Sequence, residues 1–162
     1  MKAPYLATWP LRQISAARRL FADSWPTLPR PSISVGNLAF GGRGKTPMVA
    51  AIATEAAARG LSAAILSRGY LGQVRRKHRP VILSAEAEAE GDADLAWNRA
   101  ICVDSESQSR PVLACDYGDE PLWLAARCGA AIVAVHPNRS MAAAVAMEHS
   151  DVDLFILDDG FQ

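Results

Sequence analysis

The sequence has few cysteines, no excess of either charge and no long apolar run. Its 162 residues include three cysteines, and no two of them are spaced as C-x-x-C. This number and spacing indicate neither a disulfide framework nor a zinc site, and they favour a reducing, cytosolic setting. The formal net charge is zero, so no overall basic field attracts nucleic acid, and no nucleic-acid partner is expected. No apolar run approaches the roughly 20 residues of a membrane-spanning helix, and no secretory signal is present.

What the sequence does contain is a glycine-rich loop between an apolar, β-branched run at 33–35 and an alanine-rich helical pattern over 46–59. Glycines let main-chain N–H groups approach a polyphosphate closely, and the start of a helix adds its positive dipole end. We therefore predict a phosphate-binding loop formed by Gly41, Gly42, Arg43, Gly44, Lys45 and Thr46. Lys45 would reach the β- and γ-phosphates, and the Thr46 hydroxyl would be a ligand of Mg²⁺.

This loop departs from the usual GxxxxGK[ST] pattern, because the residue five before Gly44 is Ala39 and the further glycines are Gly41 and Gly42. The alternative interpretation is a glycine-rich surface turn. The strand predicted before the loop and the helix predicted after it, which Gly60 would end, favour the phosphate-binding interpretation.

After the loop, predicted strands and helices alternate. Strands are expected at 62–67, 130–135 and 152–157, and helices at 121–128 and 140–149. This alternation predicts an α/β fold like that of the P-loop NTPases, with a mostly parallel sheet and flanking helices. The strands are apolar on both faces, as in a sheet covered on both sides, and ligands of such sheets bind at the carboxyl ends of the strands.

Two segments fall outside this alternation. Residues 84–115 are acidic and then polar, and we expect an insertion or long loop there, with a helix near 93–102 and a solvated charged face. Residues 1–30 place apolar side chains beside Arg12, Arg18 and Arg19, which predicts an amphipathic helix that lies at a membrane interface or, alternatively, packs on its own domain. The predicted domains are thus a helix at 1–30 and a nucleotide-binding domain at 31–162.

Acidic residues fall where the strand ends are expected. Asp158 and Asp159 follow the last predicted strand, where carboxylates opposite a phosphate loop hold Mg²⁺ in phosphoryl-transfer enzymes; an ordinary Asp-Gly turn is the alternative. Asp119, in Gly-Asp-Glu-Pro, precedes a predicted helix, so it is either an N-cap or a carboxylate directed at the phosphates. Arg68 and Tyr70 follow the strand at 62–67 and are candidates for phosphate and substrate contacts, or else surface residues.

Taken in order, the segments SVGNLAFGGRGKTP, ILSRGY, GDEP and LDDGFQ resemble the tetraacyldisaccharide 4'-kinase family, the lipid A 4'-kinases of Gram-negative bacteria. The resemblance runs from about Pro31 to the end, except over 84–115. It implies ATP- and Mg²⁺-dependent phosphorylation of the 4'-hydroxyl of an acylated glucosamine disaccharide. It also implies a peripheral enzyme at the cytoplasmic face of the inner membrane, with the helix at 1–30 on the membrane surface.

The resemblance also implies roles for single residues. Asp119 is the expected base, Lys45 and Asp159 are catalytic, and Thr46, Asp158 and Asp159 serve the metal. Substrate or phosphate contacts are expected from Arg68, Tyr70 and Gln162. The family continues DDGFQ with a His and carries further acidic and His site residues in its later half, so we expect this sequence to be an amino-terminal part.

Two other functions stay open on the sequence alone. One is a membrane-attached P-loop ATPase switch, although that class carries an additional lysine near the start of the loop, and residues 37–40 contain none. The other is a nucleotide-binding module without catalysis.

Overall fold

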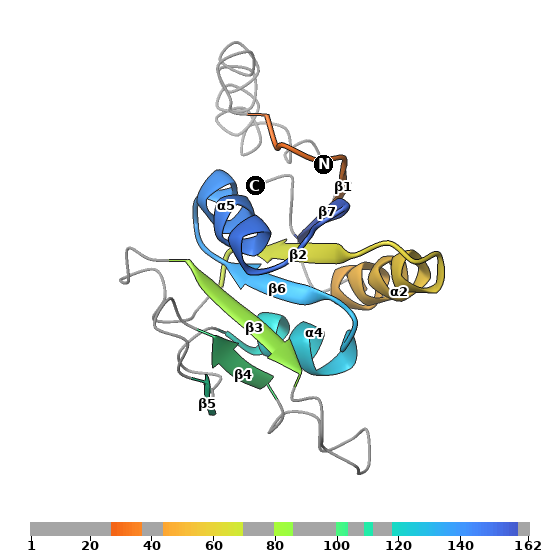
Figure 1. Ribbon diagram of the computed structural model, residues 1–162. Coiled ribbons are helices and arrows are strands. Elements are labelled where there is room, and N and C mark those ends of the chain that lie inside the picture. The colour runs from red at the N-terminus through yellow and green to blue at the C-terminus, as the bar shows by residue number, and fades with distance from the viewer. Residues whose placement is uncertain are drawn as a thin grey trace, which may run out of the picture.

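A computed structural model describes residues 27–36, 44–69, 80–85, 100–103, 109–111 and 118–158. Within these ranges the chain forms one seven-stranded sheet and three helices (Figure 1). In chain order the elements are β1 (Ser32–Val35), α2 (Lys45–Ala58), β2 (Ala63–Ser67), β3 (Val81–Ala85), β4 (Ala100–Val103), β5 (Ser109–Pro111), α4 (Asp119–Arg127), β6 (Ile132–Val135), α5 (Arg139–His149) and β7 (Leu154–Asp158).

The strand order across the sheet is β1-β7-β2-β6-β3-β4-β5. The first four strands of this order run parallel to one another, and these are the strands that the alternating pattern predicts. The α/β class with a parallel sheet and flanking helices is therefore confirmed. β3, β4 and β5 extend the sheet by antiparallel pairing at the other side.

The antiparallel part corrects one expectation for residues 84–115. A helix was expected near 93–102, but residues 100–103 form strand β4, which pairs with β3. Ile101, Cys102 and Val103 are apolar and partly β-branched, which suits a strand once a partner edge is available. The rest of the expected helix, residues 93–99, lies outside the described residues.

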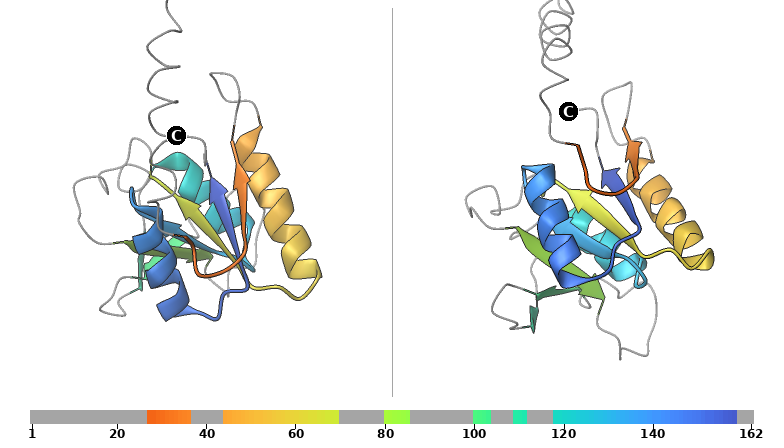
Figure 2. Two further views of the ribbon diagram at one scale, coloured as in Figure 1. Left: turned by 90° about the horizontal axis from the view of Figure 1, so that it is seen from above. Right: turned by 45° about the horizontal axis from the view of Figure 1, so that its top comes forward.

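The helices cover both faces of the sheet (Figures 1 and 2). On one face α2 and α4 pack with side chains such as Ile65, Leu83 and Val133 into one core cluster. On the other face α5 packs over Leu66 and Phe155, in a second cluster. All five residues of β2 are buried, because successive side chains of a strand enter the two clusters alternately.

Helix α2 buries one face against the sheet. Val49, Ala53 and Ala56 are buried, Ala50 joins them, and Ile52 is partly buried against the same cluster. The helix ends at Ala58, and Gly60 follows with φ 73°, so the predicted stop is confirmed.

The amphipathic helix expected at 1–30 cannot be compared with the structure, because residues 1–26 lie outside the described part. Among the helices that are described, none has the length and apolar character needed to cross a bilayer.

Candidate functional site

The parallel strands bring their carboxyl ends to one edge of the sheet. Val35 at the end of β1 lies opposite Asp158 at the end of β7, and Leu157 lies opposite Leu66, the residue before Ser67 in β2. The Ser67 Oγ donates a hydrogen bond to Asp158 Oδ2 at 3.4 Å. This edge is where ligands of open parallel sheets bind, and we call it the carboxyl edge.

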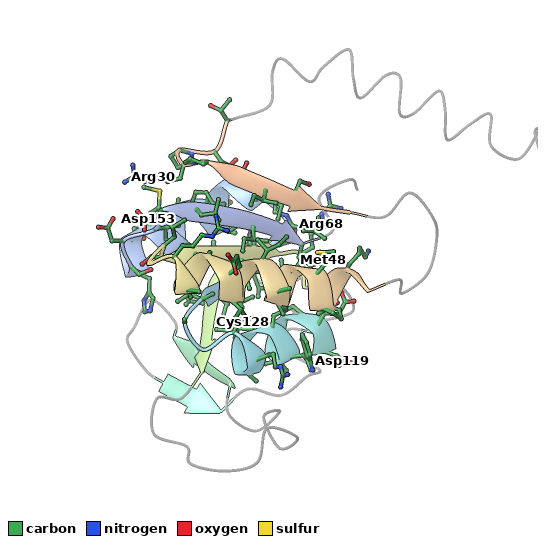
Figure 3. The ribbon with its side chains drawn as sticks, turned by 90° about the vertical axis from the view of Figure 1, so that its right-hand side faces the viewer. Arg30, Met48, Arg68, Asp119, Cys128 and Asp153 are labelled. Carbon is green, nitrogen blue, oxygen red and sulfur yellow. The ribbon has the colours of Figure 1, made fainter. Side chains whose placement is uncertain are left out.

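Helices α2 and α4 lie side by side on the sheet and both begin at the carboxyl edge. Figure 3 shows Met48 in the first turns of α2, Arg68 after β2 and Asp119 at the start of α4 at the same end of the molecule. Arg30 and Asp153 lie at the opposite end. Two positive ends of helix dipoles are thereby directed to the edge where a phosphate loop is predicted.

Gly44, at the end of the predicted phosphate loop, has a backbone conformation that favours glycine. Gly44 is the N-cap residue of α2 with φ 76° and ψ 20°, the left-handed region, and no side chain caps this helix start. The main-chain N–H of Met48 donates to the Gly44 carbonyl at 3.2 Å. Lys45 and Thr46 thus form the first turn of α2, as the loop-to-helix prediction requires; Gly41, Gly42 and Arg43 lie outside the described residues.

The start of α4 meets the start of α2. Thr46 Oγ1 donates to Glu120 Oε1 at 3.4 Å, although the two residues are 74 positions apart. A pocket of about 330 Å³ opens beside this contact, and it is lined by Thr46, Pro47, Asp119, Glu120 and Trp123. The structure therefore places Asp119 beside the predicted Mg²⁺ and phosphate residue Thr46.

Asp119 is not the N-cap of α4, so that alternative is wrong. Gly118 holds the N-cap position, and Asp119 is the first residue of the helix, with its side chain exposed. Asp119 and Glu120 both lie in the first turn, where carboxylates interact favourably with the helix dipole. The sequence analysis names Asp119 as a site residue but not Glu120, the residue that contacts Thr46. Glu120 is the second acidic residue of the Gly-Asp-Glu-Pro segment, so its charge beside Asp119 could have identified it.

Asp158 is the last residue of β7 rather than the first residue after the strand. It is buried, with 3% of its surface exposed, and it is held by contacts from both sides. Ser67 donates to its carboxylate, and the Arg139 guanidinium Nη2 donates to its main-chain carbonyl. Asp159, Tyr70 and Gln162 lie outside the described residues, and Arg68 is exposed at the same edge.

Helix α5 also begins at the carboxyl edge, on the other face of the sheet. Asn138 is its N-cap, and the Asn138 Oδ1 accepts from the N–H groups of Ser140 at 2.9 Å and Met141 at 3.4 Å. His136, two residues before this N-cap, is buried. Its main-chain N–H donates to the Ser67 carbonyl at 3.0 Å. Asp158 is therefore contacted from β2 through Ser67 and from α5 through Arg139.

The oxygen atoms of the side chains at this edge are suitable ligands for a hard cation. Thr46 offers a hydroxyl and Asp158, Asp119 and Glu120 offer carboxylates, which are oxygen ligands of the kind that Mg²⁺ takes. Within the described ranges, no three His, Cys, Asp or Glu side chains are grouped as a metal site.

The sheet order and the helix start that follows Gly44 at the carboxyl edge define an α/β protein with the fold of the P-loop NTPases. The family model described as Tetraacyldisaccharide-1-P 4'-kinase matches residues 3–104 and 98–162 of the chain. The chain belongs to this family. Together the two matched stretches include every described residue of the candidate site.

Relatives of the chain carry the same family name. The tetraacyldisaccharide 4'-kinase of Geobacter sulfurreducens is 37% identical over 152 residues, which cover 94% of this chain and 36% of the relative. That of Alcanivorax borkumensis is 35% identical over 168 residues, covering 99% of this chain and 42% of the relative. The chain therefore spans well under half of the length of these relatives.

A solved structure supports the fold. The crystal structure of the "apo" form of LpxK from Aquifex aeolicus in complex with ATP superposes with a TM-score of 0.65 at 28% sequence identity. The match covers 96% of this chain and 44% of the crystallised chain.

Proposed function

We propose that this chain is the nucleotide-binding part of an ATP-dependent kinase that phosphorylates the 4'-hydroxyl of the tetraacyldisaccharide 1-phosphate acceptor. The observation that supports this most directly is the meeting of two helix starts around one pocket. Thr46, at the end of the predicted phosphate loop, and Asp119, the predicted base, both line that pocket. A phosphoryl donor and a hydroxyl acceptor have to meet at such a junction.

In the proposed reaction the acceptor oxygen forms a bond to the γ-phosphorus as the bond from that phosphorus to the β,γ-bridging oxygen breaks. Asp119 accepts the proton of the acceptor hydroxyl. Residues 41–46 hold the phosphates through main-chain N–H groups, and the Lys45 ammonium neutralises charge that develops on the transferred group. The products are ADP and the 4'-phosphorylated disaccharide.

Magnesium and substrate contacts complete the proposal. Thr46, Asp158 and Asp159 would hold Mg²⁺, which when bound supplies neutralisation of the phosphate charge. Arg68, Tyr70 and Gln162 are proposed to contact phosphate or acceptor. The buried position of Asp158 at the carboxyl edge and the exposure of Arg68 at the same edge support these assignments.

The test of this function is a phosphoryl-transfer assay on the protein expressed from its complete open reading frame, with labelled ATP and tetraacyldisaccharide 1-phosphate in detergent micelles. We expect Asp119→Asn to lower kcat by about a hundredfold or more, the usual contribution of a general base, with little change in the KM for ATP. Lys45→Ala is expected to raise the KM for ATP and lower kcat. Asp151→Asn, an exposed carboxylate before β7 at the opposite edge, is the matched control and should leave both constants unchanged.

Three results would contradict the proposal. Unchanged kcat in Asp119→Asn would remove its role as base. ATP binding without transfer would favour a module without catalysis, and ATP hydrolysis independent of acceptor would favour an ATPase switch.

We also propose a peripheral position at the cytoplasmic face of the inner membrane, because the acylated acceptor stays in the bilayer. The support is the pattern of apolar residues with Arg12, Arg18 and Arg19, which suits an anionic interface. Co-sedimentation with vesicles that contain anionic lipid should weaken when these three arginines are replaced by glutamate. Equal sedimentation of the two proteins would contradict this placement.

A further inference from the structure

Trp123 forms a large apolar wall of the pocket between α2 and α4. It lies four residues after Asp119, and residues at this spacing lie on the same side of a helix. Its side chain is partly buried and packs against the core cluster under α2 and α4, so the indole is supported from behind. Pro47, in the first turn of α2, is a second apolar residue in the lining.

Among the described residues that line the pocket, the polar side-chain groups are a hydroxyl and two carboxylates. Thr46 and Glu120 contact each other, and Asp119 lies at the helix start beside them. Two carboxylates repel a phosphate chain that no cation neutralises, so the part of the pocket beside Trp123 suits an uncharged group that donates hydrogen bonds. Ring hydroxyls have that property, because an ionised carboxylate only accepts hydrogen bonds.

The volume of the pocket is suited to a small group. A volume of about 330 Å³ is at the lower end of the roughly 300–1,000 Å³ of ligand pockets. A pocket of this volume can accommodate a single sugar ring. A pyranose ring matches the lining, because it offers an apolar C–H face to an aromatic ring and hydroxyls at its rim.

We propose that Trp123 is the platform on which the phosphate-accepting sugar ring of the disaccharide lies, with its reacting hydroxyl directed at Asp119. The position of Thr46 supports the acceptor over adenine as the occupant. Thr46 follows the lysine of the predicted phosphate loop, so the pocket adjoins the phosphate end of the nucleotide and not its base. The assignment deepens the proposed function and depends on it for the identity of the acceptor.

The test compares Trp123→Phe and Trp123→Leu in the protein expressed from its complete open reading frame. Both replacements keep an apolar side chain against the core, but only phenylalanine keeps an aromatic face. We expect Trp123→Leu to raise the KM for tetraacyldisaccharide 1-phosphate about tenfold, the order of loss on removing an aromatic stacking partner. Trp123→Phe should recover most of this loss, and the KM for ATP should stay unchanged in both variants.

A second measurement does not depend on turnover. Adding the acceptor in micelles should change the tryptophan fluorescence of the wild-type protein, and this change should be reduced in Trp123→Phe. If the replacements changed the KM for ATP and not the KM for the acceptor, the proposal would be overturned in favour of adenine as the occupant. If Trp123→Phe and Trp123→Leu had the same KM for the acceptor, the aromatic platform would be ruled out. Absence of phosphoryl transfer in the wild-type protein would contradict the proposed function, while the fluorescence change would still report whether the acceptor reaches Trp123.

Discussion

The backbone conformation of Gly44 gives a prediction for which Gly60, just beyond the other end of helix α2, is a matched control. Gly44 at the start of α2 has φ 76° and Gly60 after its end has φ 73°, and a Cβ atom at either position would meet nothing within 4 Å. Alanine in this left-handed region costs about 1–2 kcal/mol, and its smaller unfolded-state entropy offsets about 0.4–1 kcal/mol of that cost. Gly44→Ala and Gly60→Ala should therefore each lower the free energy of unfolding by about 1 kcal/mol, which lowers Tm by about 3 °C.

The two variants should differ in nucleotide binding. Relief of the strain at residue 44 rotates the peptide groups that lead into Lys45 and Thr46, and these are the groups predicted to hold phosphate. We expect Gly44→Ala to weaken binding of a fluorescent ATP analogue about tenfold, which corresponds to about 1.4 kcal/mol. Gly60→Ala lies at the other end of the helix and should bind as the unaltered chain does.

The assay is a titration of the chain with the analogue, with thermal unfolding of each variant as the measure of stability. Equal dissociation constants for the two alanine variants, at equal loss of stability, would refute the assignment of the α2 start to phosphate binding. A large loss of stability in Gly60→Ala alone would refute the reasoning from backbone strain.

Three further predictions concern stability and reactivity. Asn138→Ala should cost about 1 kcal/mol of unfolding free energy because α5 loses its N-cap, and Asn138→Asp should cost less than half of that in the same denaturant titration. Leu124→Ala, which leaves a gap in a fully buried position, should cost about 2–5 kcal/mol, and a loss below 1 kcal/mol would contradict the packing described. Burial raises the pKa of the Cys128 thiol above its usual 9.0, and the nearby Arg127 charge opposes this shift in part. The thiol therefore loses its proton at a lower pH in the unfolded chain than in the folded chain. The free energy of unfolding should fall as the pH rises above about 9. In a protein with Cys102 and Cys115 replaced by serine, Cys128 should react with a thiol reagent only on unfolding, and rapid reaction in the folded state would contradict its burial.

Local patterns in the sequence were sufficient for the parallel half of the fold. The runs at 62–67, 130–135 and 152–157 are apolar and short, and each is separated from the next by a helical pattern or a turn, so period and length identify them. The observed strands begin one or two residues later than predicted in each case. Strand ends depend on which neighbour offers a hydrogen-bonding partner, and a single sequence does not contain that information.

The antiparallel half of the sheet could not be predicted from local sequence patterns, because its strands form only when they pair in the folded protein. Residues 93–102 contain alanine, leucine and tryptophan and favour a helix locally, yet Ala100–Val103 pairs with β3. Cross-strand pairing of a short apolar run outweighs a weak helix propensity. The same limit applies to the site, because the contact of Thr46 with Glu120 joins two helix starts that only the fold brings together.

Strand β7 is bordered by β1 on one side and β2 on the other, and both ladders are parallel. Its terminal carboxylate is consequently located by main-chain hydrogen bonding on two flanks, independently of which apolar side chains the strand carries. Interchange of isoleucine, leucine and valine along β7 should be tolerated during divergence of the family. Insertion or deletion of one residue in the strand should not, because it would turn the acid toward the opposite face of the sheet.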